Sequence, residues 1–131
     1  MPSRSFELAA AWLLKAQHDL EIARLLVRDQ KRLLDVAVYH CQQTGEKSLK
    51  GFLTAREIPF PKTHALGELL NLCHDVVPQF EQFRIQAEIL APLAHRFRYP
   101  GDAMEPTMTE AEKALGAAEE IYQFCRERIV S

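Results

Sequence analysis

One stretch of the chain places ionisable, amide and aromatic side chains at the spacing of a helix face. It reads Tyr39-His40-Cys41-Gln42-Gln43-Thr44-Gly45-Glu46-Lys47-Ser48-Leu49-Lys50. Four of its members recur at steps of four, three and four residues, so they share one stripe of a helix. The stripe consists of Tyr39, Gln43, Glu46 and Lys50, with His40 and Lys47 beside it. It is too polar for a core face, and its regular spacing predicts a functional surface.

Two further segments carry residues that suit an anionic ligand. His64 follows Thr63 at the expected start of a helix, where backbone donors and the positive dipole end favour phosphate. We expect a hydrogen-bonded histidine that fixes the loop against the bundle, with a ligand or phosphate contact as the alternative. Arg98 has five directional donors for a carboxylate or phosphate, and Tyr99 has an apolar body with a polar tip. We expect Arg98 to pair with Glu46, because an internal arginine would otherwise be a costly unpaired charge; the alternative is direct ligand contact.

The elements that must position these residues are all helical. Apolar residues recur at steps of three and four, and prolines and capping residues separate the helical segments. Pro92 should kink the fourth helix, and Thr107-x-x-Glu110 forms a capping box for the last. Short connections make neighbouring helices antiparallel. We therefore predict helices over about residues 5–29, 33–56, 65–75 and 78–94, and a fifth from about residue 107 onward.

Composition narrows the class of protein. With 131 residues we expect a single domain over residues 1–131, and no apolar run approaches the roughly 20 residues that span a bilayer. Three widely spaced cysteines favour a reducing compartment, so we expect a cytoplasmic protein. The formal net charge of −2 gives no global attraction to nucleic acid. Neither a Glu-x-x-His pair, a P-loop nor a GxGxxG fingerprint occurs, so we expect no metal and no cofactor.

Three pieces of the chain, in this order, resemble the HEPN family. They are Trp12-Leu13-x-x-Ala16-x-x-Asp19-Leu20-x-x-Ala23, then Gln43-x-x-Glu46-Lys47-x-x-Lys50, and finally Arg98-Tyr99-Pro100. The resemblance covers nearly the whole chain and implies an all-α, antiparallel (up-and-down) bundle of four to five helices that usually dimerises. Many bacterial members are encoded beside a minimal nucleotidyltransferase, and many others are ribonucleases.

The ribonuclease motif of the family is missing from this chain. Nuclease members typically carry an arginine, four to six intervening residues and a histidine. Here seven residues separate Arg56 from His64 and ten separate Arg84 from His95, and no histidine follows Arg98. Arg32 and His40 are likewise seven residues apart. The acid/base imidazole of RNA cleavage is therefore absent from its usual position, and we lean towards a protein that is not an enzyme.

The resulting hypothesis is a HEPN-type nucleotide- or RNA-associated binding protein. The resemblance implies a homodimer that partners a minimal nucleotidyltransferase in a pair of the toxin–antitoxin kind. One alternative is a ribonuclease toxin with an atypical active site built on His64 or His95. The other is a structural dimerisation domain, whose polar stripe serves only specificity between subunits. The expected ligand-binding residues are Gln43, Glu46, Lys47, Lys50, His64, Arg98 and Tyr99.

Overall fold

The computed structural model describes residues 3–101 and 105–130, and over these residues it is helical with no strand. The α-helices are α1 (Arg4–Arg24), α2 (Leu34–Ala55), α3 (Leu66–Val76), α4 (Arg84–Leu90) and α5 (Met108–Val130). A π-helical segment, Leu25–Gln30, extends α1, and two 3₁₀ segments, Pro78–Phe83 and Ala91–Ala94, precede and follow α4. The predicted all-α bundle is confirmed.

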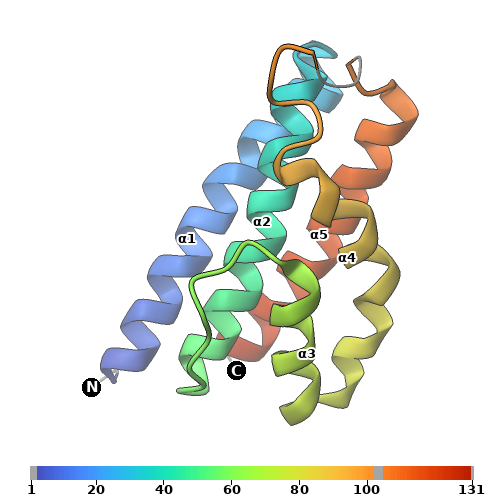
Figure 1. Ribbon diagram of the computed structural model, residues 1–131. Coiled ribbons are helices and arrows are strands. Elements are labelled where there is room, and N and C mark those ends of the chain that lie inside the picture. Colours follow the sequence, from blue (N-terminus) through green and yellow to red (C-terminus); the bar gives the residue numbers. More distant parts are fainter. Residues whose placement is uncertain (1–2, 102–104, 131) are drawn as a thin grey trace.

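Helix α2 lies at the centre of the bundle. It packs on α1 along one side and on α5 along another, and α3 and the end of the α4 region cover its remaining face (Figure 1). Helices α1 and α2 run antiparallel (Figure 1). The loop between α2 and α3, residues 56–65, turns back and crosses over α2 before α3 begins (Figure 1). Side chains on α2 therefore meet other elements on nearly every side.

The local signals in the sequence act where they were expected. Thr107 and Glu110 form the capping box, with the Thr107 amide donating to Glu110 at 3.0 Å and the Glu110 amide donating to Thr107 Oγ1 at 3.1 Å. Pro92 ends α4 and lies in the following 3₁₀ turn. Pro78 opens the 3₁₀ segment before α4. These contacts fix the ends of the elements around the site.

The core brings the end of α4 unusually close to α2. A Cβ atom at Gly45 would lie 3.0 Å from Leu90 Cδ1, so the glycine permits this approach. Phe80 is fully buried, with its ring centroid 4.7 Å from that of Phe52 and 4.9 Å from that of Phe124. Together these contacts hold the segment that leads from α3 through α4 against α2. They thereby place residues 91–95 opposite the polar stripe.

Two findings concern membrane insertion and cysteine chemistry in the described residues. No helix among them combines the length and apolarity needed to cross a membrane. The three cysteines are buried and not in disulfides, and burial raises the pKa of the Cys41 thiol to about 12. A thiolate nucleophile is therefore not available at that position near neutral pH.

Candidate functional site

The expectation that the stripe on α2 is too polar to be buried is wrong for Glu46 and Lys50, whereas Tyr39 and Gln43 are partly exposed. Glu46 is 3% exposed and Lys50 is 7% exposed. Glu46 Oε2 accepts a hydrogen bond from Lys50 Nζ at 3.0 Å, and its Oε1 accepts one from Gln42 Nε2 at 3.2 Å. His64 Nδ1 lies 2.9 Å from the same Oε1. Burial is tolerated because each carboxylate oxygen has partners.

These partners decide the ionisation of Glu46. Burial by itself raises its pKa, but hydrogen bonds from His64, Lys50 and Gln42 favour the charged form. The net effect is a pKa below the usual value for a glutamate. Glu46 is therefore an anion at neutral pH and links α2 to the loop that carries His64.

A second buried carboxylate joins α1 to α2. Asp19 is 8% exposed, its Oδ1 lies 2.7 Å from His40 Nδ1, and its Oδ2 accepts a hydrogen bond from Lys47 Nζ at 2.7 Å. Burial raises the pKa of Asp19, but the bonds from His40 and Lys47 outweigh it and leave the pKa below its ordinary value. We call Asp19, His40 and Lys47 the Asp19 cluster.

Asp19 was not among the residues expected at the site, although the sequence contains a signal for it. Asp19 follows Ala16 by three residues and precedes Ala23 by four, so it lies on the apolar face of the first helix. A carboxylate on a buried face needs cationic partners, and His40 and Lys47 flank the stripe on the neighbouring helix. The signal was therefore one acidic residue in an otherwise apolar helix face.

The two buried carboxylates predict a stability that depends on pH. Because both pKa values are lowered in the folded state, the stabilisation is present above about pH 5 and is lost as the pH falls below about 4. Urea unfolding between pH 7 and pH 3 should show a falling midpoint over this acidic range. The variant Glu46→Gln, which cannot titrate, should show a shallower fall; an unchanged profile would contradict the assignment.

Arg98 does not pair with Glu46, and that prediction is wrong. Its guanidinium carbon lies 3.7 Å from the centroid of the Tyr39 ring, so the two planar groups stack. Glu46 is already occupied by Lys50, Gln42 and His64. In the described part of the chain the Arg98 guanidinium has no ion-pair partner. Its donors therefore remain available for a ligand.

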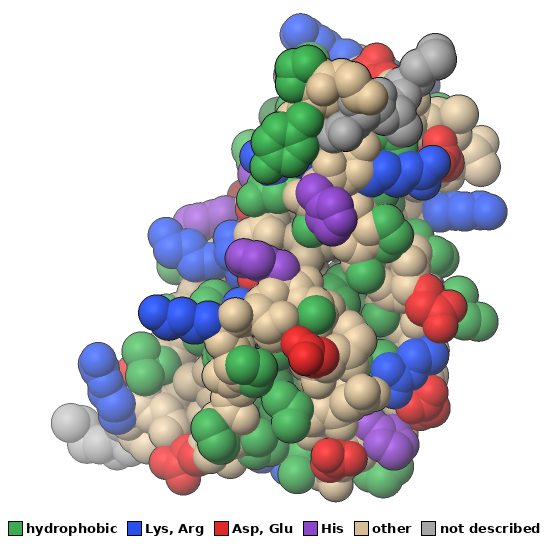
Figure 2. Space-filling view, in the orientation of Figure 1, with side chains coloured by type: hydrophobic (Ala, Val, Ile, Leu, Met, Phe, Trp, Pro, Cys, Tyr) green, Lys and Arg blue, Asp and Glu red, His purple; other side chains and the backbone are tan. Residues whose placement is uncertain are grey.

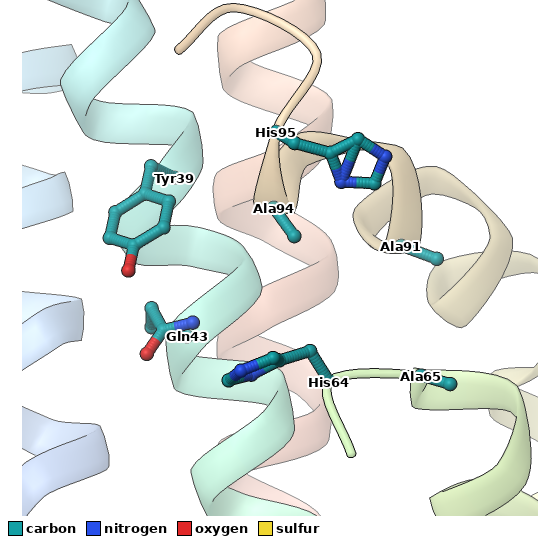
Figure 3. A pocket seen from close by; sticks show the side chains of 7 residues that line it. All are labelled: Tyr39, Gln43, His64, Ala65, Ala91, Ala94 and His95. Atoms are coloured by element: carbon teal, nitrogen blue, oxygen red, sulfur yellow. The ribbon is translucent and has the colours of Figure 1, made fainter.

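A cavity of about 430 Å³, which we call cavity A, lies beside the stripe. Tyr39 and Gln43 of α2 form one wall, and the ring of His64 extends towards them from the loop before α3 (Figure 3). His95 belongs to the opposite wall, with its ring turned away from Tyr39 (Figure 3). Three alanines complete the lining and make much of it apolar; they are Ala65, Ala91 and Ala94.

A second cavity of about 320 Å³, which we call cavity B, lies over the first turns of α2. Tyr39 lines both cavities. The remaining lining of cavity B consists of Asp35, Val36, His40, Phe97 and Arg98. Figure 2 shows histidine side chains in the middle of the visible face and a further one near its α3 end, where most of the acidic side chains also lie. Both cavities have volumes typical of small-ligand sites.

The expected ligand-binding residues fall into three groups. Gln43, His64 and Arg98 line the cavities. Lys47 and Lys50 instead serve the buried carboxylates Asp19 and Glu46. Tyr99 is 65% exposed and lines neither cavity. Tyr39, His40 and His95 lie at the cavities, although they were not among the residues expected to bind a ligand.

The fold defines a small all-helical bundle built around one polar central helix. The HEPN domain family matches the chain over residues 9–128, and the chain therefore belongs to the HEPN family.

Two solved structures share this fold. ST0689, an archaeal HEPN homologue, superposes with a TM-score of 0.76 at 23% sequence identity, covering 92% of this chain and 97% of that chain. TT1696 from Thermus thermophilus superposes with a TM-score of 0.74 at 30% identity, with the same two coverages. The comparison with curated proteins gave no match.

Proposed function

We propose that this HEPN protein is a nucleotide- or RNA-associated binding protein that acts as the dimeric partner of a minimal nucleotidyltransferase. The observation that carries the proposal is the Arg98 guanidinium, which is stacked on Tyr39 at the border of two cavities without an ion-pair partner among the described residues. Arginine in this state suits a phosphate, because its planar fork can donate two hydrogen bonds to it.

The lining of the cavities also supports a nucleotide ligand. Aromatic and alanine side chains provide apolar surface for a base, and Gln43 and His64 provide a few oriented polar groups. The buried pairs beneath the site fix these groups, because Glu46 holds His64 and Asp19 holds His40. A pre-positioned site binds more tightly, since less side-chain freedom is lost on binding.

Binding titrations test this function. ATP, GTP and short RNAs are titrated into the purified protein, alone and together with a candidate nucleotidyltransferase. We expect saturable binding that Arg98→Gln weakens by about 10- to 100-fold, the range for a charge-assisted contact. Arg96→Gln is the nearby control, because Arg96 is an exposed arginine two residues away that lines neither cavity. Its guanidinium stacks on Phe97 of cavity B and lies 3.7 Å from Glu110, so this variant removes an arginine next to the site without removing a lining residue.

Analytical ultracentrifugation of the same samples tests the assembly. A dimer of this chain, and a larger species when the nucleotidyltransferase is added, are the expected results. A monomer that neither binds any of these ligands nor forms the complex would contradict the proposal.

One specific observation favours a ribonuclease as the second candidate. His64 lines cavity A while its Nδ1 faces the buried Glu46 carboxylate, so its other ring nitrogen is left to exchange a proton with a ligand. In that case purified protein should cut mixed RNA, and His64→Ala should abolish the cutting while His95→Ala has a smaller effect. Intact RNA after incubation with the wild-type protein would remove this candidate.

A further inference from the structure

We propose that cavities A and B are two subsites for one nucleotide unit, with the base in cavity A and a phosphate in cavity B. This assignment rests on the proposed function, and it adds which part of the ligand each cavity receives. The Tyr39–Arg98 stack lies at the border of the two cavities, since Tyr39 lines both and Arg98 lines only cavity B.

Cavity A suits a neutral aromatic ring. No carboxylate and no lysine or arginine is among its lining residues, and three of the seven are alanines. Gln43 Nε2 donates to Gln42 Oε1 at 2.7 Å, which fixes its amide and leaves its own carbonyl oxygen as an acceptor. His64 keeps one ring nitrogen, because the other faces Glu46. These groups can bind the polar edge of a base, whose faces then lie against apolar walls.

Cavity B suits the phosphate. Arg98 contributes the only lysine or arginine side chain of its lining, and that side chain lacks an ion-pair partner in the described residues. His40 Nδ1 is held by Asp19, so its other ring nitrogen can contact a phosphate or a sugar hydroxyl. Asp35 also lines this cavity, and its carboxylate opposes a free phosphate but accepts a hydrogen bond from a ribose hydroxyl. Phosphate alone should therefore bind weakly.

The positions of the two cavities along α2 fit a single unit. The α2 residues that line cavity B are Asp35, Val36, Tyr39 and His40, and those that line cavity A are Tyr39 and Gln43. The two linings are therefore displaced along α2 by roughly one helical turn, about 5 Å. One sugar can bridge such a step. A free nucleotide and a residue of single-stranded RNA present the same base, sugar and phosphate, and the assignment applies to either.

The experiment compares the binding of separate parts of the ligand to the wild-type protein and to its variants. Isothermal titration is carried out with AMP, adenosine, inorganic phosphate and a four-nucleotide RNA, and with GMP and guanosine as a second pair. For the wild type we expect the nucleotide to bind at least about tenfold more tightly than its nucleoside, and phosphate alone to bind more weakly still. The relative affinity of AMP or GMP and of the RNA identifies the natural source of the unit.

Two variants assign the subsites. Arg98→Gln should reduce nucleotide affinity to that of the nucleoside and leave the nucleoside unchanged. Ala94→Phe, which fills cavity A, should weaken nucleotide and nucleoside alike by about tenfold or more. Ala91→Leu is a second cavity-filling variant if Ala94→Phe does not fold, as judged by thermal unfolding. Arg96→Gln should leave the affinities for nucleotide and nucleoside unchanged.

The outcomes separate this inference from the function on which it rests. Nucleotide or RNA binding that is insensitive to cavity filling, or an Arg98→Gln variant that weakens nucleoside and nucleotide equally, overturns the subsites and leaves the function standing. If no nucleotide, nucleoside or RNA binds the wild-type protein, with or without a nucleotidyltransferase, the function fails as well.

Discussion

Replacing Glu46 by alanine is expected to lower the free energy of unfolding by about 3–5 kcal/mol, the cost of leaving a buried charge without its partner. Lys50 is 7% exposed, and its ammonium would lose the carboxylate that lies 3.0 Å away. The loop that carries His64 would lose its hydrogen bond to α2 at the same time. Urea unfolding of the purified variant at pH 7 measures the change.

Two companion variants test the cause. The double variant Glu46→Met with Lys50→Met removes both charges and fills the space, so it should recover more than half of the loss. Glu81→Ala breaks the exposed Glu81–Arg84 pair and should leave the urea midpoint almost unchanged, because exposed ion pairs contribute little to stability. If Glu46→Ala were as mild as Glu81→Ala, the buried pair would not contribute as described.

Replacing Phe80 by alanine is expected to cost about 3–5 kcal/mol, as for other fully buried phenylalanines. Phe80 has no exposed surface and contacts the rings of Phe52, Phe83 and Phe124, which come from three different elements. Its loss would leave a void where the 3₁₀ segment Pro78–Phe83 meets α2 and α5. Chemical and thermal unfolding both measure the effect.

Ile85→Ala is the matched control for Phe80→Ala. Ile85 is another large apolar residue of the same region but is 69% exposed, so its truncation should change stability by no more than about 0.5 kcal/mol. Equal losses for the two variants would contradict the view that Phe80 is the centre of this part of the core.

The helices could be predicted because their signals are local. Apolar steps of three and four residues placed α1, α2 and α5 within a few residues of their observed bounds. Proline and the Thr107–Glu110 capping box act on their own neighbours and need no tertiary information. The π-helical end of α1 was not predicted. It is followed by left-handed backbone at Lys31 and Leu33, and neither residue type signals that conformation.

The site was predicted less well, because helical spacing reveals which residues share a face but not what the face meets. Glu46 is buried against His64 of the 56–65 loop, which folds back over α2 (Figure 1), and Lys50 lies between Trp12 of α1 and Phe60 of this loop. No periodicity indicates these contacts. The choice between Glu46 and a ligand as the partner of Arg98 likewise depended on the path of the chain after Pro92. The role of Asp19 could not be predicted without knowing that α1 packs on α2, because its partners His40 and Lys47 lie on that helix.

The close approach at Gly45 has a consequence for the range of compounds that this face can accept. With no side chain at this position, Leu90 rests directly on α2, and the turn of residues 91–94 that follows it forms one wall of cavity A. The width of cavity A thus depends on Gly45, which lines neither cavity although it lies two residues from Gln43. A bulkier residue at position 45 would act as a spacer, and the pocket would change its width without a change in any of the side chains that line it.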